Sequence, residues 1–185
     1  MDLDEIIKKR RAYRSLKKIE ISKKTVEELA ETARFSPSCF NNQPWRYVFV
    51  YNEEKLKQMH KALSKGNEWA KKASMIIAVF AKKEDDCLIY DREYYLFDTG
   101  LATSFLVLKA TELGLVAHPI AGYSPKKTRE ILGIPDEMNV ISLIIVGKHK
   151  DQIDPILSEK QRKAEKERPK RKNLDEIVFH NQYQS

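Results

Sequence analysis

Three arginines near the N-terminus are the first residues that could bind a ligand. They lie in the segment Arg10-Arg11-Ala12-Tyr13-Arg14. A guanidinium binds phosphate through two parallel, charge-assisted hydrogen bonds that a lysine cannot reproduce. Arg10 and Arg14 stand at the end of a predicted helix and could converge on one anion. Charge pattern alone favours a simpler interpretation, a solvated basic face that complements the C-terminal end of this helix.

A polar segment between two prolines, Pro37 and Pro44, is the second candidate. It reads Ser36-Pro-Ser-Cys-Phe-Asn-Asn-Gln-Pro44 and is followed by Trp45. Serine and amide side chains offer both hydrogen-bond donors and acceptors. Such a loop suits the edge of a uracil-like ring, where donors and acceptors alternate. A well-capped loop without a ligand has the same composition and stays open as an alternative.

Two further segments could contribute to a site. In Pro119-Ile120-Ala121-Gly122, the glycine lets the backbone approach a ligand closely, although an ordinary turn is the better interpretation of the glycine alone. A basic cluster spans residues 168–172. By itself it is typical of a solvated tail, and a nucleic-acid contact is the alternative that any such cluster allows.

Several standard sites are missing from the sequence. It has no GxGxxG or GxxxxGK[ST] loop, no GxSxG and no HExxH, and its four histidines show no metal-ligand spacing, so we expect no metal. Cys39 and Cys87 form no CxxC pair. They argue against a disulfide scaffold or a zinc site and agree with a reducing cytoplasm. We expect Cys39 to be a small buried thiol, because no base is evident that would activate it as a nucleophile.

Length and charge favour a single folded domain. The chain has 185 residues, 42% hydrophobic and 33% charged, with a net charge of +7. Seven basic residues and no acid fall within 8–18, and eight basic residues with three acids fall within 159–172, so the rest of the chain is mildly acidic. No apolar run is long enough to span a bilayer, and the N-terminus does not resemble a secretory signal. We therefore expect a cytoplasmic protein that is not membrane-bound.

Apolar patterning predicts the elements that position these residues. Continuous apolar runs at 74–81 and 140–146 predict buried strands, and 46–51 predicts a third. Helices are expected over 2–11, from a Thr25–Glu28 capping box to Phe35, over 53–64, over about 90–113, and from Ser124 to Gly133. Residues 115–121 suggest a short strand. Residues 148–185 form a polar arm whose late apolar residues, from Leu174 to Phe179, suggest docking on another subunit. Strands and helices do not alternate evenly, so a mixed α/β domain is expected rather than a plain doubly wound sheet.

In order along the chain, these segments resemble the FMN-dependent nitroreductase family. The family's R-R-S-x-R stands here as residues 10–14, with Ala12 in place of serine. Its P-S-x-x-N-x-Q-P-W is matched in full by residues 37–45, which is the most specific feature. Residues 98–102 resemble its D-x-G-x-A helix, residues 119–122 its P-I-x-G turn, residues 132–135 its LGIP segment and residues 171–178 its R-K-x-L-x-E-I-V end.

The resemblance implies an α+β fold with a mainly antiparallel sheet flanked by helices. It also implies a homodimer with FMN at its interface, in which the C-terminal segment extends over the partner subunit. The cofactor-binding positions that it carries over are Arg10, Arg11, Ala12, Arg14, Pro37, Ser38, Asn41, Gln43, Asn67, Pro119, Ile120, Ala121, Gly122, Arg171 and Lys172. Among them, the residues of 37–43 would reach the flavin from the partner subunit, and Arg171 and Lys172 would complete the phosphate site.

The activity implied is a ping-pong transfer of a hydride from NADH or NADPH, through flavin N5, to a nitroaromatic, a quinone or a similar acceptor. No side chain is assigned as a catalytic acid or base. Reductive dehalogenation and flavin breakdown are alternative reactions on this fold. A basic nucleic-acid-binding module is a weaker alternative, because the basic residues fall on the motif positions that resemble a phosphate site, and no nucleic acid is expected as a partner.

Overall fold

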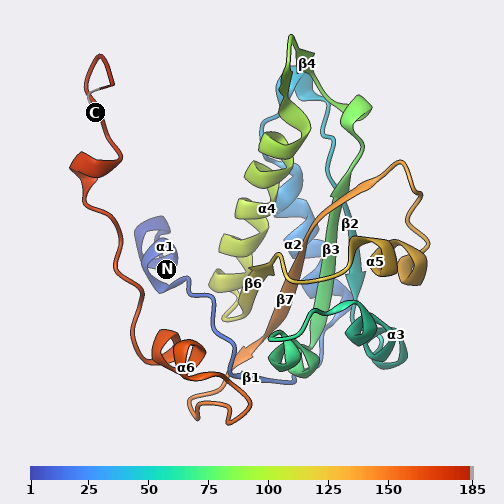
Figure 1. Ribbon diagram of the computed structural model, residues 1–185, viewed down its shortest axis with the longest axis vertical. Helices are drawn as coiled ribbons and strands as arrows, with labels where there is room; N and C mark the ends of the chain where they lie inside the picture. Colours follow the sequence, from blue (N-terminus) through green and yellow to red (C-terminus); the bar gives the residue numbers. More distant parts are fainter. Residues whose placement is uncertain (184–185) are drawn as a thin grey trace.

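An antiparallel sheet forms the centre of the computed structural model, which describes residues 1–183 (Figure 1). Its strands follow the order β1-β7-β3-β2, and β6 also pairs with β7. All of these pairings are antiparallel. The strands are β1 (Leu16–Lys17), β2 (Arg46–Val50), β3 (Met75–Ala81), β6 (Val116–Ile120) and β7 (Asn139–His149). A separate two-stranded hairpin joins β4 (Leu88–Ile89) to β5 (Arg92–Glu93).

Helices cover both faces of the sheet, so every residue of β3 is buried. Ile76 and Ala78 pack into one core with α3 and Trp69, whereas Ile77 and Val79 pack into the other with α2 and α4. The fold class is therefore the α+β arrangement that the resemblance implied. The helices are α1 (Leu3–Lys9), α2 (Lys23–Arg34), α3 (Glu53–Met59), α4 (Tyr94–Glu112), α5 (Pro125–Leu132) and α6 (Glu159–Lys166).

Helix ends follow local capping chemistry, with one correction. Ser124 caps α5 through a bond from Lys127 N, and Gly133 ends it in the left-handed conformation, as predicted. The predicted capping box at Thr25 is wrong: α2 begins after Ser22, whose side chain accepts from Thr25 N. The cap is this serine, three residues earlier than predicted, so Thr25 lies inside the first turn and donates its N–H to the cap.

The two cysteines also depart from expectation. Cys39 and Cys87 form a disulfide across a sequence separation of 48 residues, so the prediction of a free Cys39 thiol is wrong. The turn after α2 and the segment before β4 meet near the start of α4, and the spacing in the sequence does not reveal that meeting. The cysteine content therefore does not support a reducing compartment.

The segment after β7 returns to the N-terminal part of the chain. The Ser15 hydroxyl accepts from Asp154 N at 3.0 Å, and the Ser15 carbonyl accepts from Lys150 N at 2.9 Å. Beyond α6 the chain runs along the outside, and Leu174, Ile177 and Phe179 are exposed. Within residues 1–183, no helix is both long and apolar enough to cross a membrane.

Candidate functional site

A small basic pocket forms where the two ends of the chain meet. Its volume is about 200 Å³. Four of its residues come from the segment after α1, and the other four come from the end of α6 and the chain beyond it. They are Arg10, Arg11, Ala12, Arg14, Ala164, Arg168, Pro169 and Arg171. Arg10 and Arg171 thus lie together, as the resemblance implied, although they are 161 positions apart in the sequence.

The positive charges of the arginines in this pocket are not paired with acidic side chains in the described residues. Its lining contains no acidic side chain, and among residues 1–183 Arg10, Arg14, Arg168 and Arg171 form no ion pair. Burial, and then the charges of Arg168 and Arg171, lower the pKa of Arg10. An anion would relieve this crowding, and arginines at this spacing match the geometry of phosphate.

Two arginines make contacts that the sequence did not indicate. Arg11 donates to the Ala164 carbonyl at 2.8 Å and to the Glu165 carbonyl at 3.2 Å, so it holds the end of α6. Arg168 was not among the predicted site residues, yet it lines the pocket and donates to the carbonyls of Lys8 and Arg10. Lys172 is exposed and does not line the pocket, so its assignment stays a prediction.

A buried carboxylate fixes the geometry of the pocket. Glu165 accepts hydrogen bonds from Arg14 N at 2.6 Å and from Ser15 N at 3.2 Å. Its side chain is only 2% exposed. These bonds place the end of α6 against the chain that carries the N-terminal arginines.

Aromatic stacking continues the site from Arg14 toward β6. The Arg14 guanidinium lies 5.8 Å from the Trp69 ring centre, and the rings of Trp69 and His118 stack at 4.7 Å. His118 Nδ1 lies 3.1 Å from the Tyr13 carbonyl, which can only accept, so Nδ1 carries the proton. Burial lowers the pKa of His118 to about 4 against the opposing effect of this bond, so the imidazole is neutral at pH 7.

The turn after β6 is held by Asn67. Its Nδ2 donates to the Gly122 carbonyl at 2.8 Å, and its Oδ1 accepts from Trp69 Nε1 at 3.2 Å. A Cβ at position 122 would lie 2.4 Å from Asn67 Nδ2, so the approach requires glycine. Asn67 and the turn from Pro119 to Gly122 therefore belong to the same side of the molecule as Arg14.

The loop that holds Pro37, Ser38, Asn41 and Gln43 lies elsewhere. Cys39 N donates to Asp98 Oδ2 at 2.7 Å, close to the start of α4. Arg11 instead shares a pocket with Thr111, near the other end of α4. Asp98 and Thr111 lie ~20 Å apart along the helix at its rise per residue. Figure 1 shows the same separation, with β4 and α6 at opposite ends of the view. One copy of the chain therefore does not bring this loop to the arginines.

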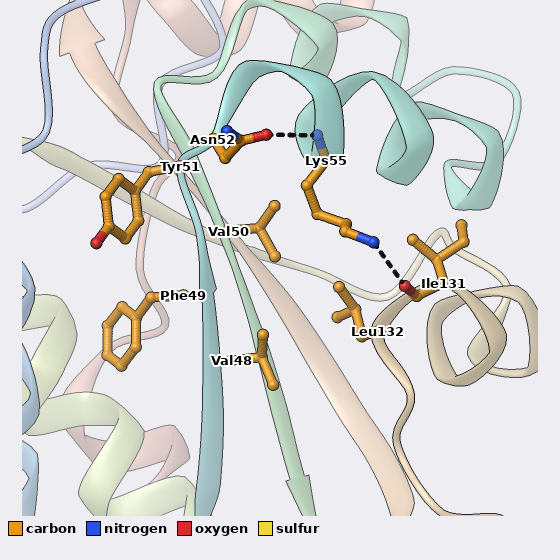
Figure 2. A pocket seen from close by; sticks show the side chains of 8 residues that line it. All are labelled: Val48, Phe49, Val50, Tyr51, Asn52, Lys55, Ile131 and Leu132. Carbon is orange, nitrogen blue, oxygen red and sulfur yellow. Dashed lines mark hydrogen bonds between the residues drawn. The ribbon is translucent and has the colours of Figure 1, made fainter.

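A larger pocket of about 480 Å³ borders β2 and α5 and contains none of the predicted site residues (Figure 2). The charged side chain that lines it is Lys55, which donates to the Ile131 carbonyl at 3.3 Å. Its remaining lining is mostly apolar, from Val48 to Tyr51 and from Ile131 to Leu132. Its lining contains no arginine, carboxylate or imidazole.

Comparison with known proteins decides the family. The model of the nitroreductase family matches residues 7–68 and 62–148. The chain belongs to the nitroreductase family. A protein of Archaeoglobus fulgidus, provisionally named NADH dehydrogenase/NAD(P)H nitroreductase, is 32% identical over 154 residues, which cover 81% of this chain and 87% of that protein.

Two other members illustrate the range of this similarity. The oxygen-insensitive NADPH nitroreductase of Helicobacter pylori is 27% identical, over 70% of this chain and 78% of its own. A crystal structure described as an oxidoreductase containing FMN superposes with a TM-score of 0.86 and 26% identity, covering 100% of this chain and 94% of the other. The resemblance to nitroreductases and the predicted fold are thereby confirmed.

The contact between Gly122 and Asn67 generates a first prediction. Gly122→Ala should force Asn67 aside, break its two hydrogen bonds and lower the free energy of unfolding by about 1–3 kcal/mol. Urea unfolding measures this loss. The matched control is Gly122→Ala in an Asn67→Ala background, where the substitution should cost much less, because the clashing amide is gone. Equal costs in both backgrounds would refute the contact.

The buried His118 generates a second prediction, on pH. Its folded pKa, about 4, lies below the ordinary 6.5, so the unfolded chain takes up the proton first as the pH falls. Stability should therefore decline from about pH 6.5 to pH 4, by at most about 3 kcal/mol from this group. Urea unfolding from pH 7 to pH 4 should show a steeper decline for the natural protein than for His118→Gln. Parallel curves would contradict the assignment.

Proposed function

We propose that this member of the family is an FMN-dependent oxidoreductase that takes its electrons from NADH or NADPH. We further propose that it works as a homodimer with FMN bound between the subunits. A nitroaromatic, a quinone or a similar small molecule would be the electron acceptor. The observation that carries the proposal is the arginine pocket built from both ends of the chain.

The pocket supports FMN through its phosphate. Arg10, Arg14 and Arg171 provide guanidinium donors from two segments, with no acid in the lining to compete. A volume of about 200 Å³ admits a phosphate group rather than a whole nucleotide, so the rest of the cofactor would lie outside the pocket. Convergence on one small pocket also favours a phosphate ligand over a nucleic acid, which needs an extended basic surface.

The other predicted site residues near Arg14 are placed where they could bind the isoalloxazine ring. Asn67 and the turn from Pro119 to Gly122 adjoin Arg14 through Trp69 and His118. Gly122 keeps the turn free of a side chain where it meets Asn67. A neutral His118 beneath the arginines adds no further positive charge at pH 7. The turn and Asn67 would bind the ring mainly through backbone groups and one amide.

Two features support the proposal that a second copy of the chain completes the site. The loop from Pro37 to Gln43 lies near one end of α4 and the arginines near the other, so only a partner's loop can complete the site. Apolar side chains that a monomer would leave in water are also exposed. They lie on α4 and along the C-terminal arm, and are Leu96, Phe97, Leu174, Ile177, Val178 and Phe179.

When bound, FMN supplies hydride acceptance from a nicotinamide and electron delivery to the acceptor. The residues of this chain would bind and orient it: the arginines hold the phosphate, and the turn and the polar loop hold the ring. No side chain needs to act as acid or base in this scheme. The nicotinamide and the electron acceptor would bind in turn at the same exposed face of the flavin ring.

The third prediction tests the cofactor. The purified protein should show the absorption of bound flavin, or acquire it on mixing with FMN. Arg10→Ala with Arg171→Ala should raise the Kd for FMN about 100-fold, because two charge-assisted hydrogen bonds are lost. The matched control is Lys170→Ala, which removes a neighbouring charge outside the pocket lining and should leave the Kd nearly unchanged. No flavin uptake, or equal effects of both changes, would overturn the proposal.

A further inference from the structure

The disulfide between Cys39 and Cys87 ties the polar loop to the segment before β4. It is closed by the chain's only two cysteines. Both residues are partly exposed, so the bond lies near the surface of the molecule. The loop on one side of the bond is the one that matches the most specific family motif.

Backbone strain shows that this loop depends on its surroundings. Phe40, Asn41 and Gln43 all have positive φ, at 45°, 59° and 50°. Residues other than glycine pay a conformational cost there and keep such angles only where neighbouring structure imposes them. Three strained residues within four positions need a firm external constraint.

The non-covalent contacts of the loop supply only part of that constraint. Cys39 N donates to Asp98 at 2.7 Å, and Asn42 Nδ2 donates to Asp86 Oδ1 at 3.3 Å. The second oxygen of Asp86 is buried without a hydrogen-bond partner among the described residues. Burial raises the pKa of Asp98, and the neighbouring Asp86 charge adds to the rise. The disulfide adds a covalent tie between this loop and the segment before β4.

We propose that the Cys39–Cys87 disulfide is a reversible redox lock that holds the loop from Ser36 to Pro44 in its strained conformation. Reduction opens the lock, and oxidation closes it. The effect of the lock on FMN binding rests on the proposed function, in which the partner's loop completes the cofactor site. The effect of the disulfide on the loop itself does not depend on the proposed function.

The chemistry is thiol–disulfide exchange with a dithiol. A thiolate of the reductant attacks Cys39 Sγ, the S–S bond breaks, and Cys87 leaves as a thiolate that takes up a proton. Asn42 Nδ2, at 3.5 Å from Cys87 Sγ, can donate to this leaving group. The second thiol of the reductant then displaces Cys39 and becomes a disulfide itself. Two electrons and two protons pass to the protein, and exchange with an oxidised dithiol reverses the reaction.

The experiment compares the oxidised and the dithiothreitol-reduced full-length protein, with the reductant removed under argon. Thiol labelling after denaturation should count no free thiols before reduction and two after it. Amide hydrogen exchange in residues 36–44 should become at least tenfold faster on reduction, while β3 and β7 stay unchanged. Unchanged exchange in 36–44, or two free thiols in the air-purified protein, would overturn the lock.

A second measurement separates the lock from the cofactor. Release of bound FMN, followed by its fluorescence, should be at least tenfold faster after reduction. The Cys39→Ser, Cys87→Ser double variant should release FMN at that faster rate with or without dithiothreitol. Faster exchange with unchanged FMN release would overturn the coupling to the cofactor. If the protein bound no FMN, the proposed function would fail, and hydrogen exchange would still decide the lock.

Discussion

The buried Glu165 carboxylate joins the two ends of the chain, and the candidate site depends on it. A carboxylate that is 2% exposed must have its oxygens satisfied, and it finds its donors in Arg14 N and Ser15 N. Arg11 secures the same junction by donating to the last carbonyls of α6. Without this junction, Arg168 and Arg171 would belong to a solvated tail. With it, they face Arg10 across one small pocket.

The sheet and α4 determine how the rest of the proposed site is distributed. Packed cores on both faces make the sheet a rigid support for β6, the turn after it and the neighbouring Asn67. The 19-residue helix α4 separates the other half of the site from it, since the loop that follows α2 packs near the start of this helix. The proposed dimer follows from this separation: two copies would supply to each other what one copy keeps apart.

The sequence predicted the parts of this structure that depend on local patterns. Continuous apolar runs indicated β3 and β7, and Ser124 with Gly133 bounded α5 correctly. Two-residue strands such as β4 and β5 carry no periodicity that could be recognised. The Ser22 cap was missed because Thr25 and Glu28 offered an equally plausible local signal.

In the candidate site, too, local motifs could be predicted and contacts between distant segments could not. Its arginines at 10, 14 and 171 could be predicted from the motifs, and the structure brings them together. Arg168 in the pocket, Arg11 on α6 and the Cys39–Cys87 bond depend on contacts between segments that are distant in the sequence. No local pattern encodes such contacts, although the basic cluster at 168–172 did contain the missing arginine.

A mixed dimer tests the central claim, a site shared between two subunits. One subunit carries Arg10→Ala and Arg171→Ala, and the other carries Ser38→Ala and Gln43→Ala, so each parent dimer should bind FMN weakly at both of its sites. In the mixed dimer, one site combines natural arginines with a natural loop, and the other combines both defects. FMN titration of the purified mixed dimer should therefore find one tight site per dimer. The absence of any tight site would show that each site lies within a single chain and would contradict the account.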